Sequence, residues 1–154
     1  MGERILLTGA TGYVGGRLAP MLLDAGHRVV CLVRDPSKLD GIPWSDRVEV
    51  VRGDVLDAST LDRAVEGIDT IYYLVHSIGA TGDFSESDRT AAVNIAVAAE
   101  RAGVSRIIYL GGIVPPETEE PSKHLASRAE VGQILLDAPV PAVVLQAGVI
   151  IGSG

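Results

Sequence analysis

Apolar residues along this chain alternate between short continuous runs and sets spaced three or four residues apart. Six short runs rich in Val, Ile and Leu occupy residues 4–8, 28–33, 48–51, 70–75, 106–110 and 141–151. Runs of this length and composition are typical of strands that are buried on both faces of a parallel sheet. The pattern therefore predicts six β-strands.

Between these runs the apolar residues follow helical spacing. We predict helices over 14–25, from 61 to near 67, over 84–102 and over 122–137, with a kink at Pro20. Residues 34–46 and the acidic, proline-rich segment 115–121 are predicted to be irregular connections, the second a surface loop. Strict alternation of strand and helix predicts an α/β fold, a doubly wound parallel (Rossmann) sheet of order 3-2-1-4-5-6 with helices on both faces.

Length and composition narrow the class of protein. A chain of 154 residues forms one good core, so we expect one domain over 1–154. A net charge of −7 without a basic stripe argues against a nucleic-acid partner, and no apolar run approaches a membrane span of ~20 residues. The lone cysteine, Cys31, lies in an apolar run and fits a reducing compartment, so we expect a cytoplasmic protein.

A glycine-rich segment follows the first predicted strand and opens the first predicted helix. Residues 8–15 read TGATGYVG. In this context Gly9 permits a sharp turn, Gly12 lets the backbone approach a pyrophosphate, and Gly15 permits close packing of helix on strand. The residues expected to lie against the pyrophosphate are Thr11, Gly12, Tyr13 and Val14. The alternative is a glycine turn that binds nothing.

Arg34 follows the second predicted strand, where folds that prefer NAD usually place an acid on the adenosine ribose. An arginine at this position favours the 2′-phosphate of NADP, because a guanidinium forms charge-assisted hydrogen bonds with phosphate. Asp35 comes next, so NAD stays open as the cofactor, and Arg34 as a solvated side chain is the plainer alternative.

Two more strand ends carry candidate cofactor contacts. Asp54 and Val55 follow the third strand, where a carboxylate and a backbone amide can meet the adenine edge, or where the acid can cap the next turn. Val75 and His76 close the fourth strand, on the side expected for the nicotinamide ribose. A histidine there can instead satisfy a local backbone group.

These segments together resemble the atypical and extended short-chain dehydrogenase/reductase families, especially their NAD(P)H-binding, nitrogen-regulator-like members. The resemblance rests on residues 8–15, on 32–36 (LVRDP), on 53–55 (GDV), on Asn94 and on 148–152 (GVIIG). It implies an NADP(H)-binding domain, with NAD as the other option, whose longer parent transfers hydride to or from an unidentified small molecule. It also leaves open a homodimer that pairs through the long helices.

The chain departs from the pattern of these families in the catalytic residues. Their Tyr-x-x-x-Lys pair lies on the helix after the fifth strand, and alignment on Ser127 places His124 at the tyrosine position and Arg128 at the lysine position. The resemblance thus implies His124 as the proton-transfer group and Arg128 as a ligand of ribose hydroxyls. The serine that these families place at the end of the fifth strand falls near Gly111 or Gly112.

The departures keep other interpretations open. These families add a C-terminal substrate-binding region, which we expect to be absent here because the chain stops just after Gly152. Without the usual tyrosine, the domain can also serve a non-catalytic redox sensor, in which cofactor occupancy changes the affinity for a protein partner. A structural module with a relic fold and no nucleotide is the third hypothesis.

Overall fold

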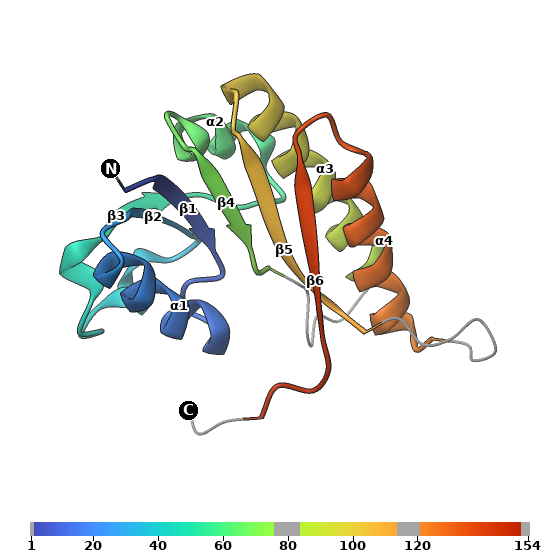
Figure 1. The fold of residues 1–154 in the computed structure, drawn as a ribbon, viewed down its shortest axis with the longest axis horizontal. Helices are drawn as coiled ribbons and strands as arrows, with labels where there is room; N and C mark the ends of the chain where they lie inside the picture. Colours follow the sequence, from blue (N-terminus) through green and yellow to red (C-terminus); the bar gives the residue numbers. More distant parts are fainter. Residues whose placement is uncertain (1, 76–83, 114–120, 152–154) are drawn as a thin grey trace.

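The computed structural model describes residues 2–75, 84–113 and 121–151. In these residues six parallel strands form one sheet of order β3-β2-β1-β4-β5-β6 (Figure 1). The strands are β1 (Arg4–Thr8), β2 (Arg28–Val33), β3 (Glu49–Arg52), β4 (Thr70–Tyr73), β5 (Arg106–Gly112) and β6 (Ala142–Ala147). The doubly wound order predicted from the alternation of strands and helices is confirmed.

The helices cover both faces of the sheet. Helix α1 (Tyr13–Asp24) packs on one face with residues 29, 31 and 33 of β2, while α2 (Leu61–Val65), α3 (Phe84–Ala102) and α4 (Lys123–Asp137) pack on the other (Figure 1). Because side chains alternate along a strand, Ile5 and Leu7 join the first core and Leu6 joins the second. Each predicted helix is therefore present.

Strand β1 is the switch point of the sheet. It pairs in parallel with β2 on one side and with β4 on the other, so the chain leaves β1 in one direction and later returns to extend the sheet in the other. Ligands of such sheets bind outside the carboxyl ends of the strands at this point. The fold thus places the glycine turn after β1 at the centre of the expected site.

The last strand is shorter than predicted. We expected it to extend to residue 151, but β6 ends at Ala147, which pairs with the last residue of β5, Gly112. The Ile113 amide donates to the Ala147 carbonyl oxygen at 3.2 Å, and residues 148–151 are not part of the strand. Strand β4 likewise ends at Tyr73 and β5 extends to Gly112. His76 and residues 115–120 of the predicted loop lie outside the described residues.

Pro20 lies inside α1, as its sequence position predicts, and the structure compensates for it. Proline has no N–H to donate to the carbonyl of Gly16, four residues earlier. The indole Nε1 of Trp44 donates to that oxygen at 3.1 Å instead. Trp44 is buried in the core on the α1 face, so the irregular segment between β2 and β3 is tied to the helix. In the described part of the chain, every helix is too short or too polar to cross a membrane.

Candidate dinucleotide site

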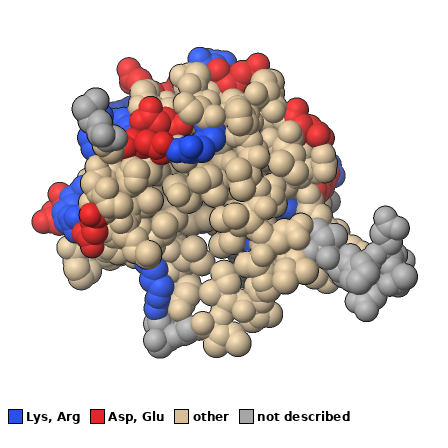
Figure 2. Space-filling view, in the orientation of Figure 1, with Lys and Arg blue, Asp and Glu red and all other residues tan. Residues whose placement is uncertain are grey.

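An open groove of about 1110 Å³ follows the carboxyl edge of the sheet, between α1, α4 and the segment after β6. Every predicted site residue that the structure describes lines this groove: Gly9, Thr11, Gly12, Tyr13, Val14, Gly15, Arg34, Asp54, Val55, Val75, His124 and Arg128. In Figure 2 the molecule is visibly hollowed between its main body and the segment that follows β6. Predicted residues from five separate parts of the sequence are therefore gathered along one surface.

The glycine turn has the geometry that a pyrophosphate site requires. Gly9 has φ of +73°, a conformation that other residues rarely adopt. A Cβ at Gly15 would lie 2.2 Å from the carbonyl oxygen of Gly9, whereas Gly12 is exposed and its Cα faces open space apart from that same oxygen at 3.3 Å. Helix packing thus fixes the identity of Gly15, and the bare backbone at Gly12 leaves room for a ligand.

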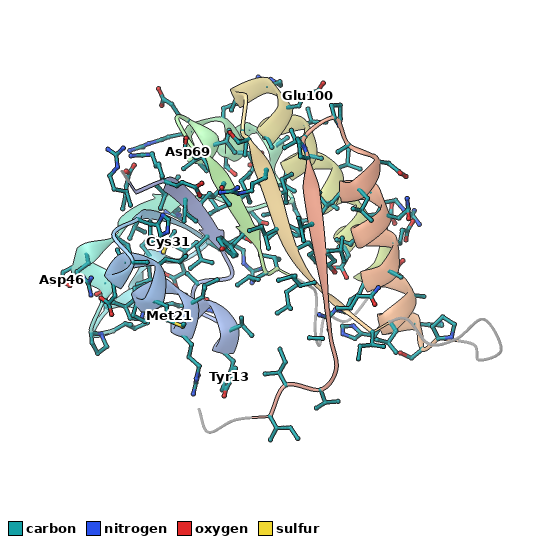
Figure 3. All side chains as sticks on the ribbon, viewed as in Figure 1. Tyr13, Met21, Cys31, Asp46, Asp69 and Glu100 are labelled. Atoms are coloured by element: carbon teal, nitrogen blue, oxygen red, sulfur yellow. The ribbon has the colours of Figure 1, made fainter. Side chains whose placement is uncertain are left out.

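The start of α1 is free to bind an anion. Its N-cap residue, Gly12, has no side chain to cap the helix, and the first turn contains no acidic residue. The first backbone N–H groups of a helix have no partners within it, and the helix dipole favours negative charge there. Tyr13 points outward from this helix end on the side of the chain's C-terminal segment (Figure 3), and the Arg17 guanidinium lies 3.7 Å from the centre of its ring.

At the end of β2 two cations and one acid line the groove, and the acid is hydrogen-bonded within its own loop. Arg34 and Lys38 both line it. Asp35 also lines the groove, but its carboxylate accepts hydrogen bonds from the Ser37 hydroxyl at 2.7 Å and from the Ser37 amide at 3.1 Å. These two bonds hold the pKa of Asp35 below its usual value, with smaller contributions from Lys38 and Arg52. The acid is therefore committed to capping the short 3₁₀ turn Pro36–Leu39.

The end of β3 combines a groove wall with local capping. Asp54 Oδ1 accepts from the Leu56 amide at 3.0 Å, so the capping role that we held open for this acid is realised. Asp54 and Val55 also line the groove. Asn94 of α3 donates to the carbonyl oxygens of Val55 and Leu56 at 3.0 and 3.2 Å, and so fastens this loop to the helix. The resemblance had singled out Asn94, but its partners could not be read from the sequence.

At the other end of the groove lie His124 and Arg128, one turn apart on α4. Nη2 of Arg128 donates to the Leu110 carbonyl oxygen at 3.0 Å, near the end of β5. Gly112 faces the same guanidinium, with Nε and Nη1 each 3.7 Å from where its Cβ would be. No acceptor among the described residues meets the buried Nε of Arg128.

Two buried polar residues at this end were not predicted. Asp88 of α3 lines the groove although it is only 4% exposed, and the Ser127 hydroxyl donates to its Oδ2 at 2.9 Å. Nothing in the local sequence distinguishes Asp88 from the solvated acids around it in α3. The one signal in the sequence is helical spacing: residue 88 lies on the same side of the helix as Ala91 and Ile95, which could have predicted that it is buried. Within the described residues, no cluster of His, Cys, Asp and Glu forms a metal site.

A doubly wound sheet with a glycine turn at its switch point and a groove along its carboxyl edge defines a dinucleotide-binding α/β domain. The chain belongs to the NAD(P)H-binding family, whose model matches residues 9–140. The family resemblance stated from the sequence motifs is thus confirmed, and the cofactor is a nicotinamide dinucleotide.

Two similar relatives are a dehydrogenase and a reductase. The chain is 40% identical over 116 residues to a 3 beta-hydroxysteroid dehydrogenase/Delta 5→4-isomerase of Mycobacterium tuberculosis, in a match that covers 69% of this chain and 30% of that protein. It is 35% identical over 137 residues to the (4-alkanoyl-5-oxo-2,5-dihydrofuran-3-yl)methyl phosphate reductase of Streptomyces griseus, which covers 89% of this chain and 44% of that protein. The chain therefore spans less than half the length of either relative.

A solved structure shares the fold. The Citrobacter sp. triphenylmethane reductase complexed with NADP(H) superposes with a TM-score of 0.75 at 23% identity, over 93% of this chain and 48% of that one. The architecture drawn in Figure 1 is thus shared with about half of that longer chain.

Proposed function

We propose that residues 1–154 are the NADP(H)-binding part of an atypical short-chain dehydrogenase/reductase, whose longer parent transfers hydride to or from a small carbonyl or alkene substrate. One observation carries the choice of NADP over NAD. Arg34 and Lys38 face the groove at the end of β2, while Asp35, the acid that could otherwise hold ribose hydroxyls, is bound to Ser37. A 2′-phosphate would complete this cationic pair.

The residues divide the cofactor between them. The amides at the start of α1 would hold the pyrophosphate over Thr11 to Val14, and Gly12 leaves space for its approach. Asp54 and Val55 would contact the adenine side of the cofactor. Val75 and His76 would contact its nicotinamide side. A bound nicotinamide supplies hydride chemistry. The chain contributes the position of the ring and the polar groups around it.

His124 and Arg128 are the proposed catalytic pair. They share one face of α4 and line the groove at the end opposite Arg34. His124 would transfer a proton at the reacting oxygen, since an imidazole nitrogen can donate or accept a proton. Arg128 would hold the ribose hydroxyls, a role that needs hydrogen-bond donors and no titration. The names of the two relatives point to a hydroxysteroid and to an oxo-dihydrofuran phosphate. Both are ring compounds, which supports a cyclic carbonyl or alkene as the substrate of the parent.

The direct test is a titration of the purified chain with NADPH and NADH. Trp44 is the only tryptophan, and its emission overlaps the absorption of the reduced nicotinamide, so energy transfer reports binding of either cofactor. The apparent melting temperature gives a second measure, because ligand binding to the folded state adds RT ln(1 + [L]/Kd) to stability. We expect NADPH to bind at least about tenfold more tightly than NADH, as one charge-assisted phosphate contact implies. Equal affinities would contradict the NADP assignment, and absence of binding would contradict the proposed function.

Arg34→Gln tests the assigned phosphate contact. The variant should lose about tenfold in NADPH affinity and little in NADH affinity, because only NADPH carries the 2′-phosphate. Arg63→Gln is the matched control, since Arg63 is an exposed arginine of α2 that does not line the groove. Equal losses for both cofactors would remove Arg34 from the phosphate site.

A redox sensor is the second candidate function. It is favoured by the burial of the two tyrosines near the nicotinamide end of the groove. Tyr73 and Tyr109, near the nicotinamide end, are each 1% exposed, and burial raises the pKa of both. Neither is placed to replace the usual proton donor. Cofactor binding by the full-length parent without turnover of any carbonyl or alkene probe, together with a change of partner affinity on binding, would support this alternative.

A further inference from the structure

Asp88 is the one charged side chain that the described part of the chain buries, at 4% exposure. It lies in α3, beside the end of the groove that holds His124 and Arg128. Burial of a carboxylate costs several kcal/mol unless hydrogen bonds compensate it, and an apolar residue would pack α3 against α4 at lower cost. An acid at this position therefore needs an explanation beyond packing.

Its partner connects it to Arg128. The hydroxyl of Ser127, itself 2% exposed, donates to Asp88 Oδ2 at 2.9 Å. Ser127 directly precedes Arg128 in α4, so a bond that fixes Ser127 also fixes the backbone from which the arginine side chain extends. The pair joins residues 39 positions apart in the sequence.

Arg128 is held from two further sides. The Tyr109 hydroxyl donates to the backbone carbonyl oxygen of Arg128 at 3.3 Å, and Nη2 of Arg128 donates to the Leu110 carbonyl oxygen at 3.0 Å. No ion pair among the described residues includes Arg128, and its buried Nε has no acceptor there. The guanidinium is thus held on the groove wall, and its Nε lacks an acceptor among the described residues.

We infer that Asp88 and Ser127 are positioning residues for the nicotinamide half of the cofactor: their hydrogen bond fixes the turn of α4 that presents Arg128 to the ribose. The inference rests on the proposed function. A side chain held in its binding geometry before the ligand arrives loses less conformational entropy on binding, so the buried bond increases cofactor affinity. The adenosine half of the cofactor binds at the end of β2, away from α4, and so does not depend on this hydrogen bond.

The test compares two ligands that share the adenosine half. NADPH contains the nicotinamide ribose, and adenosine 2′,5′-bisphosphate does not. Ser127→Ala should weaken NADPH binding by about tenfold, the usual effect of losing a hydrogen bond to a charged group, and leave the bisphosphate affinity within about twofold of wild type. Gln133→Ala, on the exposed part of the same helix, is the control and should change neither affinity.

Two further variants keep the test decisive if Ser127→Ala folds poorly. Arg128→Gln, at a half-buried position, should lose as much NADPH affinity as Ser127→Ala, and the double variant should lose no more than Arg128→Gln alone. Asp88→Asn keeps an oxygen that accepts from Ser127 and should bind NADPH as wild type does, whereas Asp88→Ala should not.

The outcomes separate this inference from the proposed function. A wild-type chain that binds neither ligand overturns both. A wild-type chain that binds both ligands, combined with equal losses for both ligands in Ser127→Ala, shows a general structural role and overturns the positioning role alone. Unchanged NADPH affinity in Ser127→Ala, or additive losses in the double variant, overturns it as well.

Discussion

The thiol of Cys31 lies in the centre of β2 and is fully buried, and its burial raises its pKa to about 12. The thiolate is the reactive form, and an exposed thiol has a pKa of about 8.5. At pH 8 we therefore expect the native chain to react with a disulfide reagent at least about a thousandfold more slowly than the urea-unfolded chain. Release of the reagent's chromophore measures both rates. A fast reaction of the folded chain would contradict the burial of this strand.

Single residues divide into those that the sequence could assign and those that it could not. Gly9 and Gly15 were predictable because backbone geometry excludes any side chain at them, and a local motif reports such constraints. Asp88 and Ser127 were not, because their bond depends on how α3 packs against α4. For Asp54 the sequence left two roles open, and the bond to the Leu56 amide establishes the local one.

At the scale of one element, α1 depends on a residue outside it. Pro20 removes the donor that the Gly16 carbonyl would have, and Trp44 supplies a substitute. Trp44→Phe should destabilise the chain by about 2 kcal/mol or more, because it removes packing and leaves a polar group unpaired. In a Pro20→Ala background, where the new backbone N–H at position 20 can donate to the Gly16 carbonyl, the same change should cost about 1 kcal/mol less.

Urea unfolding of the four chains of this cycle gives the coupling energy between positions 20 and 44. Packing losses at Trp44 occur in both backgrounds and cancel, so the coupling isolates the hydrogen bond. Strictly additive changes would show that the indole contributes to α1 only through burial. The sequence predicted the conflict at Pro20 but not its solution, because the contact spans 28 residues through an irregular segment.

The pattern of apolar residues predicted the bounds of a strand best where a neighbouring strand pairs with it along its full length. The ranges predicted for β1 and β2 match the structure because each has partners along its whole length. The range predicted for β6 was wrong at its end, because a run of apolar letters cannot show where the adjacent strand stops. The end of a strand is thus a property of the pair, not of the segment.

Over the whole molecule, the charged residues avoid the middle of one face. In the view of Figure 2 they gather towards the margins, and the central surface is uncharged. The groove is lined by three cations, Arg34, Lys38 and Arg128, and by three acids, Asp35, Asp54 and Asp88, so these side chains balance one another in a chain of net charge −7. A groove with balanced charges repels a polyanionic cofactor less than the acidic domain as a whole does. The total charge alone could not predict this arrangement, because it depends on which strand ends meet.

The opposite edge of the sheet holds the chain together through Glu3. Its carboxylate accepts hydrogen bonds from the Arg106 guanidinium and from the Thr70 hydroxyl, the latter at 3.0 Å, and so joins the N-terminal segment to β4 and β5. These bonds, that from Arg106 first, lower the pKa of Glu3 below its ordinary value of 4.5. A carboxyl group whose pKa is lower in the folded state stabilises the fold above its unfolded pKa and loses this contribution as the pH falls through the folded pKa.

Glu3→Gln should therefore reduce the free energy of unfolding by at most about 1 kcal/mol at pH 7, since the pair is partly exposed. The difference between the two chains should stay constant down to about pH 5 and shrink as the pH falls below the ordinary value of 4.5. Urea unfolding at a series of pH values between about 3 and 7 measures it, with Glu66→Gln, at an exposed glutamate, as the control. A difference that grows in acid would mean that Glu3 is protonated more readily in the folded chain, and that the contact with Arg106 does not form in solution.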